Sequence, residues 1–357
     1  MSRLLFVGPN WKGSSARSLR EGLGTIPGVL IDEIAEDQYA PIYKSVPLRV
    51  ANRLLNRLQI LELERDTLAK VKSFKPDVMV VYKGNLVTTN LLRKLKALGL
   101  PLINVFPDFS PHSHGHRLSD ALHQYDLVIS TKPFHPSHWA PTYGYANRCV
   151  FVPHGYDPEV HYWPIAAEEQ TIDVALAATW RPEYHKLLIA LGQQAALSSV
   201  RFALSGPGWE PHRRDFPSAW QFPGSLYGRA YGTWLRNSKI VIAPVHSINV
   251  VKGKRQPGDQ DTTRSYELAA SGCFFLHRRT PYIKTMYDEQ TEVPMWDDAA
   301  ELGRLIAKYL PLVEERRAMA RRAHLRAVPD YSIPERAKAV HQWIEELIAI
   351  KLESQRP

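Results

Sequence analysis

Cysteine is scarce in this chain, with two residues, Cys149 and Cys273, among 357. Both lie in apolar, strand-like segments, which favours buried thiols in a reducing compartment over a disulfide or a cysteine-ligated metal. The chain also lacks an apolar run of the ~18 residues that a membrane-spanning helix needs. Residues 1–8 are too short for a signal peptide and predict a first strand. We therefore expect a cytoplasmic protein, with peripheral attachment to the inner membrane face left open.

Two common nucleotide-binding motifs are missing as well. The loop at 8–15 is neither a Gly-x-Gly-x-x-Gly fingerprint nor a Walker loop, because its lysine precedes the glycine. What the chain does have is length enough for two domains, and its 44% hydrophobic content supports two ordinary cores. The formal charge of +9 fits an anionic ligand, a nucleic acid or an anionic membrane surface, and charge alone does not choose among them.

Strand-like and helix-like segments alternate, which predicts an α/β fold of parallel sheets with helices on both faces. The expected strands are 3–7, 77–82, 102–106, 126–130, 148–152, 172–177, 200–204 and 239–243. The expected helices are 14–22, 48–74, 183–196, 227–237, 299–309, 313–327 and 333–352. The proline-rich segment 153–164 predicts a passage between two domains.

The most informative segment is 262–277, Thr-Thr-Arg-Ser-Tyr-Glu-Leu-Ala-Ala-Ser-Gly followed by Cys-Phe-Phe-Leu-His. It predicts a threonine-capped helix, a glycine stop and a short buried strand. The start of such a helix near Thr263 suits an anion. Arg264 opposes the helix dipole there, and a bound phosphate or carboxylate would offset that cost. Glu267, on the same face, can accept hydrogen bonds from sugar hydroxyls, although an internal Arg264–Glu267 pair is the alternative.

This segment resembles the donor-site helix of GT-B glycosyltransferases, in which two Rossmann-like domains face each other across a cleft. A closer likeness is to the spore-maturation-type family of group 1 glycosyltransferases, in which an Arg-Thr-Phe-Glu-like run precedes Ala-Cys-Gly and a hydrophobic strand. The order of segments from 102 to 343 follows the same layout. The resemblance implies a Rossmann-like acceptor domain over 1–158, a Rossmann-like nucleotide-sugar donor domain over 159–330, and a helix within 331–357 that returns to the first domain.

On the donor side, the resemblance implies that Arg181 and Lys186, in a loop after a buried strand, hold the donor diphosphate. Cations suit that task because a departing nucleoside diphosphate develops negative charge. Surface cations at a helix start are the alternative. Gly206 lies in a Ser-Gly-Pro-Gly turn that resembles a nucleotide-binding turn. Asp259 stands where family-4 transferases have an acidic residue, eight positions before Glu267.

The first domain is expected to bind the acceptor. Gly13 and Ser14, in the loop after the first strand, are predicted neighbours of the donor phosphates, with a tight turn as the alternative. Asp108 would orient or deprotonate an acceptor hydroxyl unless it only caps a loop or helix. His112 would contact the transferred sugar. Three alternate histidines within 112–116 lack cysteine or carboxylate partners, so we predict no zinc site there.

The predicted activity is that of a nucleotide-sugar-dependent, hexosyltransferase-like glycosyltransferase. The acceptor hydroxyl would belong to a glycan, a lipid-linked molecule or a small molecule. Likeness to retaining families implies retention, and no metal or other cofactor is expected. Asp259-Gln260-Asp261 matches the spelling of a metal-binding Asp-x-Asp, but it leads from a basic loop into a helix.

Two other functions stay open. A non-hydrolysing nucleotide-sugar epimerase shares this architecture, but it needs more acid–base carboxylates in the cleft. A non-catalytic binder of nucleic acid or anionic membrane would explain the charge. It would not explain phosphate-type features at strand ends, and nucleic acid is therefore not an expected partner. The sequence specifies neither the base and sugar of the donor nor the acceptor.

The predicted helix at 48–74 has two interpretations. It is either a core helix with a basic outer face or an amphipathic helix on a membrane that carries a lipid-linked acceptor. The residues that favour the second are Arg49, Arg53 and Arg57, with Val50, Leu54, Leu58 and Leu61.

Overall fold

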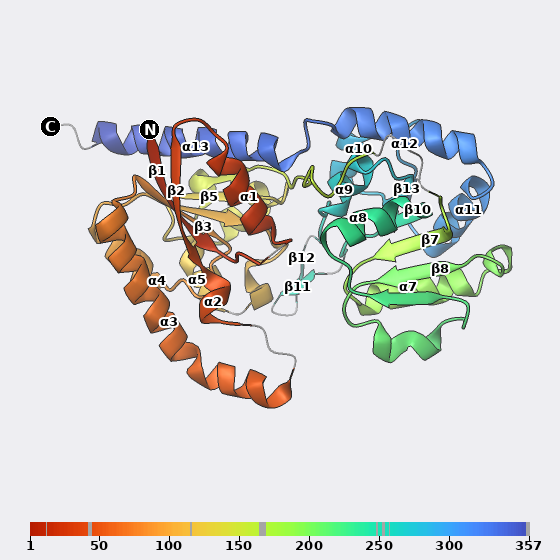
Figure 1. Ribbon diagram of the computed structural model, residues 1–357, viewed down its shortest axis with the longest axis horizontal. Coiled ribbons are helices and arrows are strands. Elements are labelled where there is room, and N and C mark those ends of the chain that lie inside the picture. Colours follow the sequence, from red (N-terminus) through yellow and green to blue (C-terminus); the bar gives the residue numbers. More distant parts are fainter. Residues whose placement is uncertain are drawn as a thin grey trace. The chain divides into compact units, whose positions relative to one another are not determined.

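The chain divides into two compact units, each built on its own parallel sheet (Figure 1). The computed structural model describes residues 1–354 except 12, 42–44, 115, 164–168, 248, 252–253 and 257. Unit 1 comprises Met1–His154, Val250–Arg255 and Ile333–Pro357. Unit 2 comprises Gly155–Asn249 and Gln256–Ser332.

Unit 1 holds a six-stranded sheet in the order β2-β1-β3-β4-β5-β6, with every pairing parallel. The strands are β1 (Ser2–Gly8), β2 (Val29–Ala35), β3 (Val78–Tyr82), β4 (Leu102–Phe106), β5 (Leu127–Ser130) and β6 (Cys149–Phe151). The α-helices before the second unit are α1 (Ser15–Gly24), α2 (Glu36–Tyr39), α3 (Val46–Phe74), α4 (Thr89–Ala97), α5 (His116–Leu122) and α6 (Ala140–Thr142). β3 and β4 are apolar almost throughout and buried along their whole length, as strands covered on both faces must be.

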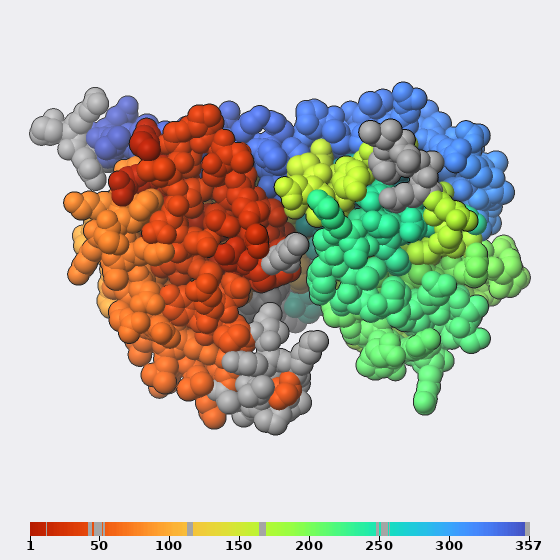
Figure 2. Space-filling view, viewed as in Figure 1, coloured from red at the N-terminus to blue at the C-terminus, as the bar shows by residue number. Residues whose placement is uncertain are grey.

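The last helix of the chain, α13 (Ile333–Ser354), belongs to unit 1 and completes its core. Ala337, Val340 and Ile344 are buried in the same cluster as Leu4 and Phe6 of β1. Figure 1 shows α13 in blue beside the red N-terminal segments of this unit. On the face seen in Figure 2, the surface of unit 1 is formed largely by red and orange segments, from the first part of the chain. The expected return of the C-terminal helix is confirmed.

Unit 2 holds the second six-stranded sheet, in the order β14-β13-β10-β7-β8-β9, also parallel. Its strands are β7 (Ile172–Ala177), β8 (Phe202–Ser205), β9 (Gln221–Gly224), β10 (Ser238–Ala243), β13 (Phe275–Arg278) and β14 (Met295–Trp296). Its α-helices are α7 (Pro182–Gly192), α8 (Gly228–Arg236), α9 (Arg264–Ala270), α10 (Pro281–Met286), α11 (Ala299–Tyr309) and α12 (Val313–Ala327). Two short strands, β11 (Asn249–Val251) and β12 (Lys254–Gln256), pair with each other.

The α/β fold with two parallel sheets confirms the predicted class, and Cys149 and Cys273 are buried free thiols as expected. Five strands were missed: β2, β9, β11, β12 and β14. β2 is an edge strand whose Asp32 and Glu33 break the apolar run that marks a buried strand. Among the described residues, the helices are too short or too polar to cross a bilayer.

Candidate active site

In unit 2, the polar residues gather where the parallel strands end. α9 runs back against the strands toward β13, so its first residue, Arg264, lies at the carboxyl edge of the sheet, like the loops that follow β7 and β10. A backbone hydrogen bond joins two of these segments, because the N–H of Asp259 donates to the carbonyl of His246 at 2.8 Å. Glu183, at the start of α7, accepts a hydrogen bond from Nδ1 of His246. The edge is therefore tied together by bonds between segments distant in sequence.

Four charged groups affect the pKa of the buried phenol of Tyr184 on α7. Burial is the main reason why the pKa of Tyr184 rises to about 12. The charges of Arg264 and Arg181 lower that pKa, whereas those of Glu183 and Asp259 raise it. Three residues predicted from the sequence to bind the donor, Arg181, Asp259 and Arg264, thus act on one buried hydroxyl.

Arg264 is the cation of this group whose buried N–H, at Nε, has no hydrogen-bond acceptor among the described residues. Its charge also lowers the pKa of buried His277, which burial, the main cause, brings down to about 4. A guanidinium that opposes a helix dipole and keeps an unsatisfied buried N–H is costly in a protein without a ligand. The alternative of an internal Arg264–Glu267 pair is wrong, because the ion pairs among the described residues do not include it.

Glu267 is held by aromatic neighbours instead. Its Oε2 accepts a hydrogen bond from the hydroxyl of Tyr231 at 3.2 Å, and its Oε1 lies 3.9 Å from Nε2 of His161. Burial lowers the pKa of His161 even though the charge of Glu267 raises it. The carboxylate is therefore fixed in orientation while its side chain remains 17% exposed. It still has lone pairs for a ligand hydroxyl.

The helix start differs from the expected cap. Thr263 has helical backbone angles and its side chain makes no capping bond, so the predicted threonine cap is wrong. Inside the helix, Oγ of Ser265 accepts from the N–H of Thr262, which precedes the helix, and hydrogen-bonds Nε2 of His277 at 2.8 Å. Asp261 is fully buried, and its Oδ2 accepts a hydrogen bond from the hydroxyl of Tyr266 at 2.7 Å.

Two other residues predicted to bind the donor, Lys186 and Gly206, are not part of the group of four charged residues that affect Tyr184. Lys186 is exposed and about 200° around α7 from the inward-facing Tyr184. Gly206 is required by the fold itself, because its φ is +134° and a Cβ there would lie 2.2 Å from the carbonyl oxygen of Ala178. The turn thus brings the loops after β7 and β8 into close contact.

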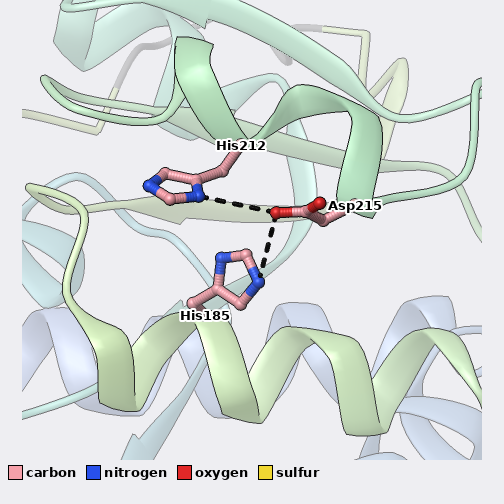
Figure 3. A group of neighbouring side chains, drawn as sticks. All are labelled: His185, His212 and Asp215. Atoms are coloured by element: carbon pink, nitrogen blue, oxygen red, sulfur yellow. Dashed lines mark ion pairs between the residues drawn. The ribbon is translucent and has the colours of Figure 1, made fainter.

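A histidine–carboxylate cluster braces the loop that carries Arg181 (Figure 3). Nε2 of His185 and Nδ1 of His212 each lie 3.5 Å from Oδ2 of Asp215. Such a set suits a divalent metal. However, the indole N–H of Trp180 donates to Nδ1 of His185 at 3.2 Å, so the proton of the neutral ring sits on Nε2. Metal binding through Nε2 needs the opposite tautomer. Trp180 also stacks on His212 at 4.2 Å, and the cluster therefore fixes the residue that precedes Arg181.

In unit 1, the corresponding edge centres on Asp108, which follows β4. Its Oδ2 lies 2.9 Å from Nζ of Lys83, directly after β3. Lys83 has a φ of +64°, in the left-handed region that non-glycine residues seldom adopt. The strained backbone is held on both sides, because its N–H donates to Val105 and its carbonyl accepts from the side chain of Asn104. Strain that the surroundings enforce in this way is typical of functional sites.

Buried titratable groups surround this pair. His135 donates from Nε2 to the carbonyl of Phe109, and burial lowers its pKa to about 3, so the ring is neutral at pH 7. Burial also lowers the pKa of His154, whose Nε2 hydrogen-bonds Thr131. Glu36 is 5% exposed, and burial raises its pKa to about 7 although Leu86 donates a backbone N–H to it.

The other residues predicted for unit 1 have local roles. Ser14 caps α1 by accepting from the N–H of Ala16, and Gly13 takes a φ of +94° just before it. His112 hydrogen-bonds the hydroxyl of Tyr143 at 2.6 Å and packs against its ring. The structure does not bring His112 into hydrogen-bonding contact with Asp108.

Comparison with known proteins shows what the chain is similar to. Residues 185–342 match the sequence model of the family described as glycosyl transferase-like. Together with the fold, this match supports a glycosyltransferase of the GT-B fold. No curated protein matches this sequence.

Solved structures share the fold of this chain at low sequence identity. HepE of Anabaena, in complex with UDP-glucose, matches with a TM-score of 0.69 and 12% identity, covering 97% of this chain and 100% of its own. Sucrose-phosphate synthase of Thermosynechococcus elongatus gives 0.67 and 12%, covering 98% and 100%. AviGT4, involved in avilamycin A biosynthesis, gives 0.62 and 17%, covering 98% of both chains.

Several groups at the two sheet edges of this chain were not predicted. Lys83, Glu36 and His135 carry no motif, and their neighbours become visible only once the strands are aligned. Glu183 and His246 are 63 residues apart, so their contact has no signal in a single sequence. A polar residue directly after an apolar strand, as at Lys83, was the available cue.

Proposed function

We propose that the protein transfers a sugar from a nucleoside-diphosphate sugar to an acceptor hydroxyl, with retention of configuration and without a metal ion. The observation that carries the proposal is the pair of arginines beside Tyr184. Neither Arg181 nor Arg264 forms an ion pair among the described residues, and Arg264 keeps a buried N–H without an acceptor. A diphosphate would satisfy both guanidiniums. HepE, which has the same fold, binds UDP and UDP-glucose, which supports a donor of this class.

In the proposed reaction, the bond between the sugar's anomeric carbon and the diphosphate oxygen breaks, and the bond to the acceptor oxygen forms on the same face. The leaving diphosphate gains negative charge, which Arg181 and Arg264 stabilise in the place that a metal takes in other transferases. The acceptor's proton passes to a diphosphate oxygen. Glu267, fixed by Tyr231, would accept hydrogen bonds from ribose or sugar hydroxyls. The likeness of these residues to retaining families supports retention.

On the acceptor side, we assign Asp108 the task of orienting the hydroxyl. Its ion pair with Lys83 holds the carboxylate in place, where it can accept a hydrogen bond from the acceptor hydroxyl. The acceptor is a glycan, a lipid-linked molecule or a small molecule with a free hydroxyl. The spore-maturation-type subfamily stays a prediction, as does the contact of His112 with the sugar.

The test is a panel of UDP-, GDP-, ADP- and dTDP-sugars incubated with the protein in excess EDTA. Release of nucleoside diphosphate is followed by chromatography, and the anomer of the released sugar by proton NMR at early times. We expect hydrolysis of one donor class, undiminished by EDTA, with the donor's anomeric configuration in the product. Activity that needs magnesium or manganese would contradict the metal-independent mechanism, and the inverted anomer would contradict retention.

A further inference from the structure

The first half of α3 is built differently from the second. In the second half, Leu63 and Thr67 are fully buried against unit 1. In the stretch 51–59, by contrast, none of the described side chains is buried. Figure 1 shows the first turns of α3 projecting beyond the sheet of unit 1. This half of the helix therefore does not owe its composition to the core.

Four leucines nevertheless lie exposed there. Leu54, Leu55, Leu58 and Leu61 are 79%, 50%, 63% and 61% exposed. Leu54, Leu58 and Leu61 follow the i, i+4, i+7 spacing that puts residues on one face of a helix, and we call these three with Leu55 the leucine face. Single exposed leucines need no explanation, but a contiguous apolar patch marks an interaction surface.

The charge within residues 46–61 has one sign, and the first acidic residue after them, Glu62, borders the end of the leucine face four residues after Leu58. Residues 46–61 contain three arginines, at 49, 53 and 57, and no aspartate or glutamate. Arg57 is exposed, three residues after Leu54 and four before Leu61, so it borders the leucine face directly.

Exposed leucines together with positive charge indicate which kind of partner this face binds. A second copy packed symmetrically on the leucine face would bring like charges at Arg57 together, which disfavours a dimer. An anionic bilayer accepts both features, because leucines enter the boundary of the acyl chains while arginines reach the headgroups. We propose that the leucine face of α3 docks the protein on the surface of an anionic lipid bilayer, with the helix lying in the interface.

The proposal has a consequence for the substrate that rests on the proposed function. A glycosyltransferase held on a bilayer by its acceptor unit meets acceptors carried by lipids at high local concentration. A lipid-linked acceptor is therefore favoured over a free glycan or small molecule. Docking itself is tested without donor or acceptor, so it can fail while the transferase activity stands.

The experiment is flotation of the full chain with vesicles of phosphatidylcholine alone or with 30–50% phosphatidylglycerol (about the anionic content at which a surface potential attracts cations). We expect binding to the anionic vesicles that weakens with salt, as screening requires. Arg57→Gln should weaken it about fivefold. The triple variant Leu54→Gln, Leu58→Gln, Leu61→Gln should abolish it, a loss on the order of 100-fold.

A matched control replaces three leucines of similar exposure elsewhere, Leu98, Leu325 and Leu352, with glutamine. Circular dichroism verifies that both triple variants are folded. The control should bind like the original protein. Equal binding by the two triple variants, or no preference for anionic vesicles, would overturn the proposal. A dimer in light scattering that only the leucine-face variant dissociates, without vesicle binding, would assign the face to a second copy instead.

Discussion

Glu36 makes a pH-dependent contribution to stability whose sign and size follow from its burial. The pKa of this carboxyl is about 7 in the folded protein, against an ordinary value of 4.5, mainly because burial penalises the charged form. The folded state thus binds the proton more tightly than the unfolded state. The contribution of Glu36 to the free energy of unfolding is fully present below pH ~4.5 and is lost as the pH rises through 7. The difference between these two pKa values corresponds to about 3 kcal/mol of stability.

Glu36→Gln removes this titration and retains an oxygen that can accept the N–H of Leu86. The variant should match the original protein near pH 5 and exceed it by about 3 kcal/mol at pH 8, or roughly 6–12 °C in melting temperature. Thermal unfolding at half-unit pH steps measures the difference. Glu346→Gln, at an exposed position of the same unit, serves as the control. A stability difference for Glu36→Gln that does not change between pH 5 and pH 8 would refute the reasoning.

Three further predictions concern single residues. Asp108→Asn should lower transfer ~100-fold and leave nucleotide binding unchanged, and full transfer would reduce Asp108 to a structural role. Glu267→Gln should weaken donor binding ~10-fold or more in calorimetry, whereas an unchanged dissociation constant would remove this carboxylate from the site. Gly206→Ala should cost about 3 kcal/mol or more, because the new methyl would meet the carbonyl of Ala178. Gly224→Ala, with no atom within 4 Å, should cost about 1 kcal/mol by denaturant unfolding, and equal losses would contradict the steric argument.

The sequence predicted most of the fold because its central elements are strongly patterned. β7 was placed at its observed bounds from an apolar run, and α11 and α12 from helical spacing. The missed strands all lie at the edges of their sheets, where polar residues are tolerated. In β2, for example, Asp32 pairs with Lys70, a contact that no local pattern reveals.

Residues of the candidate site could be predicted where a side chain is unfavourable for the local secondary structure. Arg264 attracted attention because a cation in the first turn of a helix needs a reason, and the structure leaves its Nε without an acceptor among the described residues. Lys83 was not predictable, because its positive φ arises from hydrogen bonds to Val105 and Asn104 on the neighbouring strand. Lys186 was predicted to bind the donor only because its spacing resembles that of the family. It lies on the exposed side of α7, because it is two residues from the buried Tyr184 on the same helix.

The most direct test of the account is calorimetric titration of the protein with the nucleoside diphosphate that its donor screen identifies. Arg264→Gln should raise the dissociation constant about 10- to 100-fold, since a charged hydrogen bond is worth about 1.5–3 kcal/mol. Arg317→Gln, an exposed arginine of the same unit, should leave it unchanged. Equal affinity in the Arg264→Gln and Arg317→Gln variants would contradict a diphosphate site at the carboxyl edge of the second sheet.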